Sequence, residues 1–251
     1  MQIDLVSIIT PAYNAEKFIG YTIESVINQT YPYWEMLIVD DGSTDKTEDI
    51  VKKYSNKDQR IKYYKQNNSG SASARNNGIR KSKGRYIALL DADDVWRPDF
   101  LKKQIQLLKD KNTVCAFSSY GRIDETSSQI GKPTMAKEKI TSRDMKVMNY
   151  IGCLTGLYDS NKYGKIFLDE SLNSIRDDYY YWFTIVSLDN VAYGNKEILA
   201  DYRVLKNSTT GNKIKLIRKQ YDFYRNHLDE NFIEAFVNVI RWGVTGIYKF
   251  R

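Results

Sequence analysis

Short apolar runs alternate with helix-like periods over the first hundred residues of the chain, and three of these runs end in a polar cluster. The segments Leu5–Thr10, Met36–Val39 and Tyr86–Leu90 are predicted to be buried strands. Such alternation is typical of β-α-β units, in which helices join parallel strands. We therefore predict an α/β protein with a mixed, mainly parallel sheet flanked by helices.

Apolar spacing predicts the remaining elements. One helix carries Ile19, Ile23 and Val26 on one face, and a second is capped by Asp41 or Ser43. Residues 121–150 are predicted to be an irregular excursion that covers a site. We divide the chain into a domain of residues 1–210 and a C-terminal amphipathic helical tail of residues 211–251. Further helices are expected over 72–81, 98–108 and 177–188, and further strands over 61–65, 114–120 and 198–204.

Composition excludes several protein classes. With 42% hydrophobic and 27% charged residues, the chain is neither disordered nor fibrous. Two cysteines, Cys115 and Cys153, are too few for a disulfide framework and favour a reducing setting. The N-terminus does not resemble a signal peptide, and no stretch approaches the roughly 18 apolar residues that span a bilayer. We expect a cytoplasmic protein that is at most peripheral at the inner face of the cell membrane.

The formal net charge of +7 suits nucleic acid, phosphorylated small molecules or an anionic membrane, and charge alone does not choose among them. Acidic residues at the strand ends would repel a nucleic-acid backbone, and no nucleic-acid-binding motif is present. A nucleic-acid partner is therefore not expected. The first strand lacks a following GxGxxG, which argues against a dinucleotide-dependent oxidoreductase.

The three polar clusters follow strand ends, where ligands bind in open α/β sheets. They comprise residues 10–14, 40–43 and 91–94. In Asp91-Ala-Asp-Asp94, carboxylates two residues apart on an extended segment point the same way and suit Mg²⁺ or Mn²⁺ bound to a diphosphate. Polar turns and helix caps are the alternative explanation for each cluster taken alone.

In this order the clusters resemble the family 2 inverting glycosyltransferases, which have the Rossmann-like GT-A fold. Bacterial members make surface polysaccharides of the O-antigen, capsule or teichuronic acid type. The resemblance implies transfer of a sugar from a nucleoside diphosphate, most often UDP, to an acceptor hydroxyl with inversion, with Mn²⁺ or Mg²⁺ as cofactor. It rests on Ser7–Asn14, Val39–Asp45, Asn68–Gly78 and Leu90–Asp94.

The same resemblance implies a nucleoside site. Pro11 and Tyr13 would lie beside the base, with Tyr13 stacked on it, and Asn14 would belong to the same substrate-binding cluster. Asp41 would accept a hydrogen bond from the base.

Phosphate and sugar contacts are implied further along the chain. Asp91 would bind ribose or the donor sugar, and Asp93 would hold the metal that bridges the phosphates. Arg75 would flank the donor, where a guanidinium suits phosphate or sugar hydroxyls.

An inverting transfer needs a general base for the acceptor hydroxyl. The family supplies it from an acidic pair that precedes an aromatic residue, and here Asp177 and Asp178 precede the aromatic run ending at Trp182. We predict Asp178 as the base, with Asp177 as the alternative, and Trp182 as a substrate-binding residue. Two exposed acids at a helix N-terminus would be the structural alternative. The segment 200–210 resembles the Tyr-Arg segment that closes the phosphate side in many bacterial members, which implies that Arg203 and Ser208 contact the diphosphate.

The tail carries apolar residues such as Phe232, Phe236 and Ile240 at helical spacing, with basic residues among them. Packing, dimerisation and contact with an anionic membrane all suit this pattern. Membrane contact would suit a lipid-linked saccharide acceptor. A catalytically inactive nucleotide-sugar-binding protein is the alternative to the enzyme.

Overall fold

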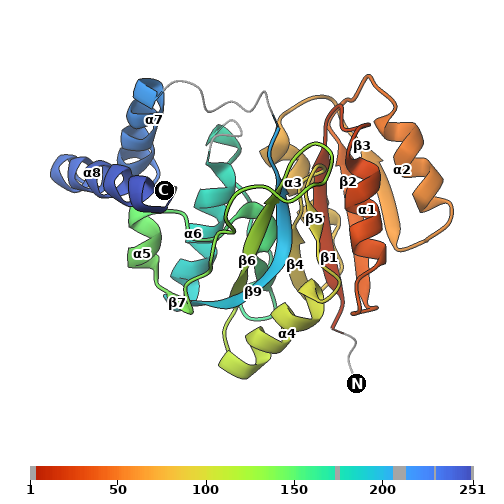
Figure 1. Cartoon of the computed structure of the whole chain (residues 1–251), viewed down its shortest axis with the longest axis horizontal. Coiled ribbons are helices and arrows are strands. Elements are labelled where there is room, and N and C mark those ends of the chain that lie inside the picture. The colour runs from red at the N-terminus through yellow and green to blue at the C-terminus, as the bar shows by residue number, and fades with distance from the viewer. Residues whose placement is uncertain (1–3, 173–175, 206–212, 229, 250–251) are drawn as a thin grey trace.

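A nine-stranded sheet forms the centre of the computed structural model, which describes residues 4–172, 176–205, 213–228 and 230–249 (Figure 1). The strand order is β3-β2-β1-β4-β8-β6-β9-β5, with β7 paired to β9. The strands are β1 (Val6–Ala12), β2 (Trp34–Asp40), β3 (Ile61–Lys65), β4 (Tyr86–Leu89), β5 (Val95–Trp96), β6 (Cys115–Ile123), β7 (Lys139–Ile140), β8 (Leu157–Asp159) and β9 (Ala192–Arg203). The helices are α1 (Ile19–Ile27), α2 (Thr47–Ser55), α3 (Ser71–Lys81), α4 (Phe100–Lys111), α5 (Ser142–Val147), α6 (Asp177–Asp189), α7 (Lys213–Asn226) and α8 (Phe232–Lys249).

The longer strand pairings are parallel, as the alternation of apolar runs predicts. β1 lies between β2 and β4, and Ile9 pairs with Leu37 on one side and Leu89 on the other. Because these three strands run the same way, the polar clusters that follow them meet at one edge of the sheet. The short strand β8 is antiparallel to both β4 and β6. It joins the parallel strands β1 to β4 to the parallel pair β6 and β9.

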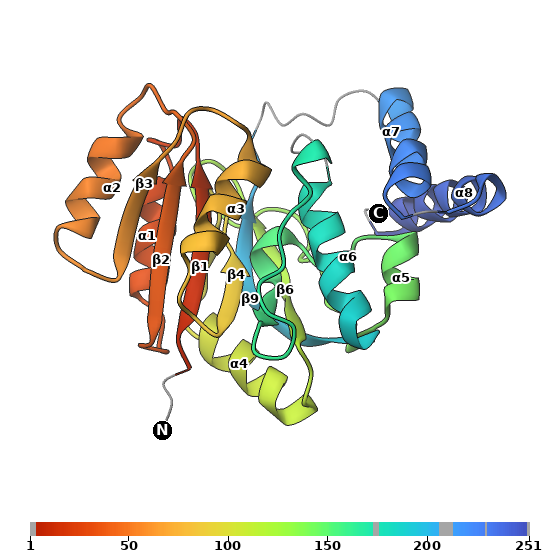
Figure 2. The same ribbon diagram turned by 180° about the vertical axis from the view of Figure 1, so that it is seen from behind.

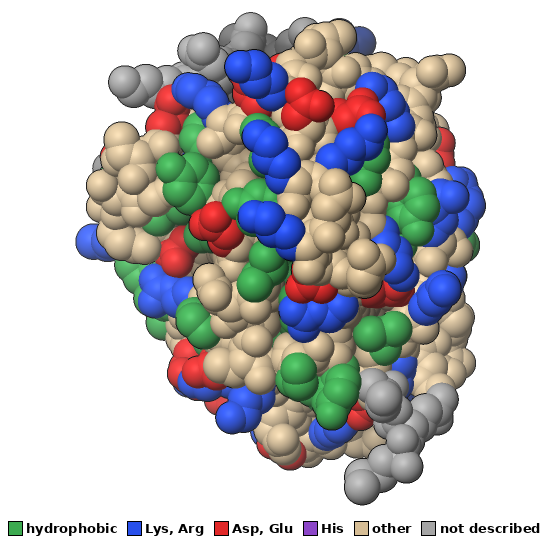
Figure 3. All heavy atoms as spheres, turned by 90° about the vertical axis from the view of Figure 1, so that its right-hand side faces the viewer, with side chains coloured by type: hydrophobic (Ala, Val, Ile, Leu, Met, Phe, Trp, Pro, Cys, Tyr) green, Lys and Arg blue, Asp and Glu red, His purple; other side chains and the backbone are tan. Residues whose placement is uncertain are grey.

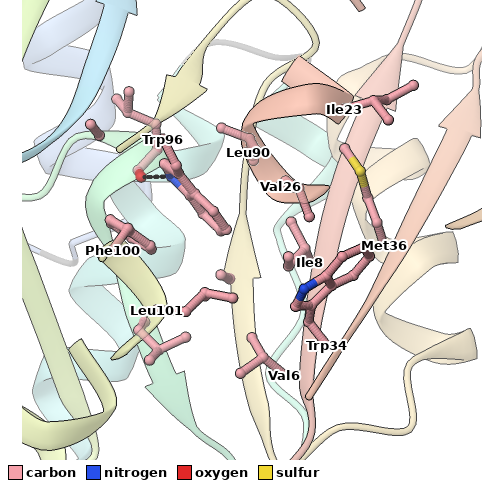
Figure 4. Packing of buried hydrophobic residues seen from close by; sticks show 14 of the residues in the cluster. Val6, Ile8, Ile23, Val26, Trp34, Met36, Leu90, Trp96, Phe100 and Leu101 are labelled. Carbon is pink, nitrogen blue, oxygen red and sulfur yellow. Dashed lines mark hydrogen bonds between the residues drawn. The ribbon is translucent and has the colours of Figure 1, made fainter. Parts of the chain in front are cut away.

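Alternate residues of the strands face two cores. Ile8 and Met36 pack with α1 and α4 on one face, where Trp34 and Trp96 lie fully within the cluster (Figure 4). The indole nitrogen of Trp96 donates a 2.7 Å hydrogen bond to the Leu154 carbonyl, which links this core to the segment before β8. Burial of the apolar surface of this cluster is the main source of stability for the sheet.

The opposite face is covered by α3 and α6 (Figure 2). Ile9 and Leu37 from the strands belong to this second core. Gly78 lets α3 approach β1 closely, because a Cβ at this position would lie 2.5 Å from the Ile9 side chain. This close approach of α3 to β1 positions Arg75, which lies one turn earlier on the same helix, at the edge of the sheet where the strands end.

α7 and α8 extend the second core beyond the sheet. The Tyr224 hydroxyl on α7 donates a 3.0 Å hydrogen bond to the Val147 carbonyl on α5, and the Tyr179 hydroxyl on α6 donates to the Met145 carbonyl. The tail helices are therefore anchored beside the helix that carries the predicted base. Within the described ranges, no helix combines the length and the hydrophobicity that crossing a bilayer requires.

β3 lies at one edge of the sheet beside α2 (Figure 1). Basic and acidic side chains are interspersed on this side of the molecule (Figure 3). The amines of Lys52 and Lys65 lie 2.7 Å and 2.6 Å from the carboxylate oxygens of Glu48. Charged side chains along an edge strand discourage pairing with another chain.

Three local predictions need correction. α2 begins at Thr47 and not at a cap formed by Asp41 or Ser43, because those side chains bond to neighbouring loops and Asp45 accepts from the Thr47 amide. Residues 121–150 are only partly irregular, since they include the end of β6, β7 and α5. β9 begins at Ala192, earlier than predicted.

Candidate active site

A cavity of about 900 Å³ lies beyond the carboxyl ends of β1, β2 and β4. The polar clusters predicted from the sequence converge there, together with the start of α3. Ligand sites of this class of fold occupy the same crevice. The predicted site residues that line the cavity are Pro11, Tyr13, Asn14, Asp41, Arg75, Asp91 and Asp93.

Asn14 joins the first two clusters. Its backbone has a left-handed conformation with φ of 47°, which asparagine tolerates better than most residues. Its amide donates to the Ser43 hydroxyl over 2.9 Å, and its side-chain oxygen accepts from the Thr44 amide over 2.9 Å. These bonds fix the loop that presents the Tyr13 ring, which is 55% exposed at the cavity mouth.

The Asp41 carboxylate holds the loop that leads into α3. It accepts from the backbone amides of Ser69 and Gly70, each over 2.8 Å, and from the Gln66 side chain over 2.9 Å. Asp41 is buried, yet it lines the cavity. The side chain thus shapes the floor of the cavity by positioning the entrance to α3.

Arg75 lies at the centre of the site. Its guanidinium donates to Asp91 over 2.6 Å and to Asp177 over 2.7 Å, and its side chain is buried. Burial acts to lower the pKa of this guanidinium, but the surrounding acids, with Asp91 foremost, raise it above its ordinary value. The charged arginine therefore ties the β4 loop to the start of α6.

A second cavity of about 470 Å³ shares Ser71, Arg75 and Asp91 with the first. It is lined by both acids of the predicted catalytic pair, Asp177 and Asp178. Burial and then the charge of Asp177 raise the pKa of Asp178 to about 6, against the opposing effect of Arg75. A carboxylate with a pKa this near neutrality suits a general base.

The β4 loop carries two more acids in unusual surroundings. Burial, followed by the charge of Asp91, raises the pKa of Asp93 to about 6. Asp94 is almost completely buried, and its carboxylate accepts from the Arg203 amide over 2.8 Å. Burial is also the main cause that raises the pKa of Asp94 well above its ordinary range.

Arg203 does not line either cavity, contrary to the predicted diphosphate contact. Its guanidinium is buried and donates to the carbonyls of Asp93 and Asp124, each over 2.8 Å. These bonds fix the acidic loop from behind, so the contact with substrate is replaced by a positioning role. Ser208, the companion of Arg203 in that prediction, lies outside the described residues.

Trp182 needs a similar correction. The indole has no exposed surface and belongs to the second core, where its ring packs against Gly156. The predicted substrate contact is therefore replaced by a packing role. Trp182 follows Asp178 by one turn of α6, which accounts for the spacing between the acidic pair and this aromatic residue.

Sequence reasoning missed two tyrosines. Tyr120 on β6 and Tyr202 on β9 line the second cavity beside the acids. The sole sequence signal was that Tyr202 directly precedes Arg203 in the segment already noted. Their meeting depends on the pairing of β6 with β9, which no local pattern encodes.

Comparisons with known proteins identify the family of the chain. The family model described as glycosyl transferase family 2 matches residues 7–160. A putative teichuronic acid biosynthesis glycosyltransferase of Bacillus subtilis, TuaG, is 37% identical over 246 residues, covering 98% of this chain and 97% of its own. An Escherichia coli protein, named UDP-Glc:alpha-D-GlcNAc-diphosphoundecaprenol beta-1,3-glucosyltransferase WfgD, is 35% identical over 250 residues, covering 98% of this chain and 94% of its own.

Solved structures show the same fold. TarS of S. aureus (residues 1–349, in complex with UDP) matches with a TM-score of 0.67 at 21% identity, over 94% of this chain and 70% of that one. A mannosyltransferase from Pyrobaculum calidifontis, solved with GDP-Man and Mn²⁺, matches with a TM-score of 0.61 at 18% identity, over 95% of this chain and 64% of that one. The predicted GT-A fold is confirmed. The chain belongs to glycosyl transferase family 2 and is a glycosyltransferase.

Proposed function

We propose that the protein transfers a sugar from a UDP-linked donor, with inversion, to a lipid-linked saccharide in surface polysaccharide synthesis. The observation that carries this proposal is the pair of cavities joined at Arg75 and Asp91, with Asp178 in the second. Two substrates can thus meet beside a base. The relatives support the substrate classes, since one is named for teichuronic acid biosynthesis and another for a diphosphoundecaprenol acceptor.

The nucleotide belongs in the larger cavity. Tyr13 offers an exposed ring for stacking on a base. The Asp41 carboxylate accepts three hydrogen bonds from the loop that leads into α3 and keeps one acceptor site, on Oδ2, for the base. UDP is the nucleotide bound in the TarS structure with the same fold. The donor sugar then extends toward Arg75 and Asp91, where the cavities join.

A divalent cation fits this donor set. Among the described residues no three His, Cys, Asp or Glu side chains converge to form a complete metal site. Mg²⁺ and Mn²⁺ sites in nucleotide enzymes use one or two carboxylates and complete the shell with phosphate oxygens and water. Asp93 at the cavity wall supplies such a carboxylate, and Mn²⁺ or Mg²⁺ would neutralise charge on the departing diphosphate.

The transfer then follows from the positions of this chain's own groups. The Asp178 carboxylate takes the proton of the acceptor hydroxyl, whose oxygen attacks the anomeric carbon as the bond to the diphosphate breaks. Because the base is in the cavity beyond the donor, attack comes from the face opposite the leaving group and inverts the centre. Arg75 fixes Asp177, and through it the start of α6, relative to the donor.

We extend the proposal to the membrane surface. α8 exposes Phe232 by 68%, Ile233 by 72% and Phe236 by 55% along one face. Beside this face a groove between α5 and α8 is lined by three basic side chains, Arg143, Lys146 and Arg241, and by two acidic ones, Glu230 and Glu234, so that its net charge is positive. An apolar face with basic side chains at its margin suits an anionic lipid surface better than a neutral one.

Sedimentation with vesicles tests the membrane contact. Phe236→Glu is expected to abolish binding to vesicles rich in phosphatidylglycerol, and phosphatidylcholine vesicles are expected to bind the wild type weakly. The matched control is Tyr33→Ala, which changes an exposed aromatic residue about 200 positions before α8. A Phe236→Glu variant that still sediments with anionic vesicles, or a wild type that forms dimers through this face, would contradict the contact.

Thermal stabilisation tests the donor site. The protein is heated with UDP, GDP, dTDP or CMP, each with and without Mn²⁺, because a ligand that binds only the folded state raises its apparent stability. We expect the largest shift with UDP and Mn²⁺, and its loss in Asp93→Ala. If no nucleotide raises the melting temperature, the proposed donor site is overturned. Asp178→Asn distinguishes an enzyme from an inactive binding protein, because in an enzyme this variant should lose turnover and still bind the donor.

A further inference from the structure

The cavity that contains Asp178 has an aromatic part that the proposed chemistry leaves unused. Tyr120 and Tyr202 line it, and they come from the strand pair β6 and β9 and not from the acid-bearing elements. Tyr202 is 41% exposed, and four acidic residues line the same cavity. An exposed aromatic ring inside a polar cavity contributes little to folding and is available to a ligand.

The two rings have a defined arrangement. In the parallel pairing, Tyr120 lies opposite Ala200 and Arg122 lies opposite Tyr202, which brings both tyrosines to neighbouring positions of one face. Their centroids are 6.5 Å apart and their planes are inclined by 71°, so the edge of one ring meets the other. Edge-to-face contact holds Tyr202 in orientation while leaving ring surface exposed.

No hydroxyl contact explains these tyrosines. Within the described part of the chain, neither the Tyr120 nor the Tyr202 hydroxyl makes a hydrogen bond to a neighbouring group. Burial raises the pKa of Tyr202 to about 12, so the phenol stays neutral at physiological pH. What the cavity contains is therefore a neutral aromatic surface set among carboxylates.

That combination matches a pyranose ring. One face of such a ring carries C–H bonds and is apolar, whereas hydroxyl groups radiate from its edge and need polar partners. An aromatic ring attracts the C–H face through its negative π surface, and carboxylates accept from the hydroxyls. The cavity volume of about 470 Å³ is within the range of small-ligand pockets.

We propose that Tyr202, held edge-to-face by Tyr120, stacks against the acceptor pyranose and determines which acceptor sugar is used. This inference rests on the proposed function and deepens it. The acceptor is the occupant, because the donor sugar lies where the cavities join at Arg75 and Asp91. Stacking of the pyranose ring on Tyr202 fixes the position of the reactive sugar hydroxyl relative to Asp178.

Direct binding tests the proposal without turnover. Saturation-transfer NMR is recorded for the methyl glycosides of glucose, galactose and N-acetylglucosamine, with UDP and the diamagnetic ion Mg²⁺ present. We expect saturation of ring C–H protons with wild type and Tyr202→Phe, and its loss in Tyr202→Ala. Tyr33→Ala is the matched control, since Tyr33 is 49% exposed and forms a similar edge contact with Tyr31 outside both cavities.

Kinetics add a readout that separates acceptor from donor. With N-acetylglucosamine-diphospholipid as the acceptor, Tyr202→Ala is expected to raise the acceptor KM about tenfold, as loss of one aromatic stack predicts, and to leave the donor KM unchanged. An equal rise in the donor KM would overturn the assignment, as would unaltered saturation in Tyr202→Ala or no saturation of any glycoside by the wild type. Thermal stabilisation of Tyr202→Ala by UDP verifies that the variant is folded. If UDP does not stabilise the wild type, the proposed function itself is refuted.

Discussion

The guanidinium of Arg75 lies 2.7 Å from the carboxylate of Asp177, although the two residues are 102 positions apart in the chain. Both side chains are almost completely buried. The same guanidinium also reaches Asp91 over 2.6 Å. One arginine on α3 therefore holds the acidic loop after β4 and the start of α6 in a single arrangement.

Replacement of Arg75 by glutamine should destabilise the protein. Removal of one partner from a buried ion pair leaves an uncompensated charge and costs about 3–5 kcal/mol. Urea unfolding measures the change. Arg80→Gln on the same helix is the control, because its guanidinium is exposed and lies 3.5 Å from Glu170, where an ion pair contributes under about 1 kcal/mol. Equal effects of the two variants would contradict the central role of Arg75.

Asp178→Asn should lower kcat by roughly 10²- to 10⁴-fold, the usual contribution of a general base. UDP affinity should stay unchanged, because the amide keeps the shape of the side chain and lies outside the larger cavity. Asp177→Asn should act more weakly on kcat and more strongly on stability, since Asp177 serves as the partner of Arg75. The reverse order of the two kcat values would transfer the role of base to Asp177.

The rate should rise with pH through about 6. The pKa of Asp178 is raised to about 6 by burial and by Asp177, while Arg75 opposes the shift, and the base acts only when ionised. Below this pKa, kcat should fall about tenfold per pH unit at saturating metal and substrates. Because the folded pKa exceeds the unfolded value of about 4, Asp178 also contributes a stability that is lost as pH rises from about 4 to 6. An unchanged acid limb in Asp178→Asn would assign it to another group.

Gly156→Ala should destabilise the protein without touching either cavity. A Cβ at this position would lie 2.4 Å from the Trp182 ring, and overpacking of a core costs about 1–3 kcal/mol. Trp182→Phe should partly relieve the clash in the double variant. Gly243→Ala is the control, because nothing lies within 4 Å of its added Cβ and alanine favours the helix. Calorimetry records the midpoints, and an equal loss in both variants would contradict this packing.

Local pattern predicts three neighbouring strands of the sheet, β1, β2 and β4, well. β1, β2 and β4 are apolar runs that end in turn residues, so both the strands and the meeting of their polar ends follow from the sequence. β8 has only three residues, too few for a period to emerge, and its antiparallel insertion is set by the elements on either side. Short strands of this kind are specified by tertiary contacts rather than by local propensity.

The site follows the same division. Acidic side chains after strands are visible in the sequence, whereas the burial of a side chain is not. The sequence therefore predicts substrate contacts for Arg203 and Trp182, although both side chains are buried. Arg203 resembles a phosphate ligand in every local respect, and only the carbonyls of Asp93 and Asp124 reveal its actual partners. In the second cavity, the sequence predicts the acidic pair Asp177 and Asp178, but it does not predict that the packing of β6 with β9 brings Tyr120 and Tyr202 beside them.

The bond from Arg203 to the Asp93 carbonyl spans 110 positions and has a consequence for biosynthesis. During translation β1, β2, β3 and β4 emerge before β9, so the acidic loop after β4 lacks the bond from Arg203 until the ribosome has added β9. A nascent chain arrested between these points would carry loosely held acids next to an assembled crevice. The acidic loop therefore reaches its final arrangement only after β9 has been synthesised.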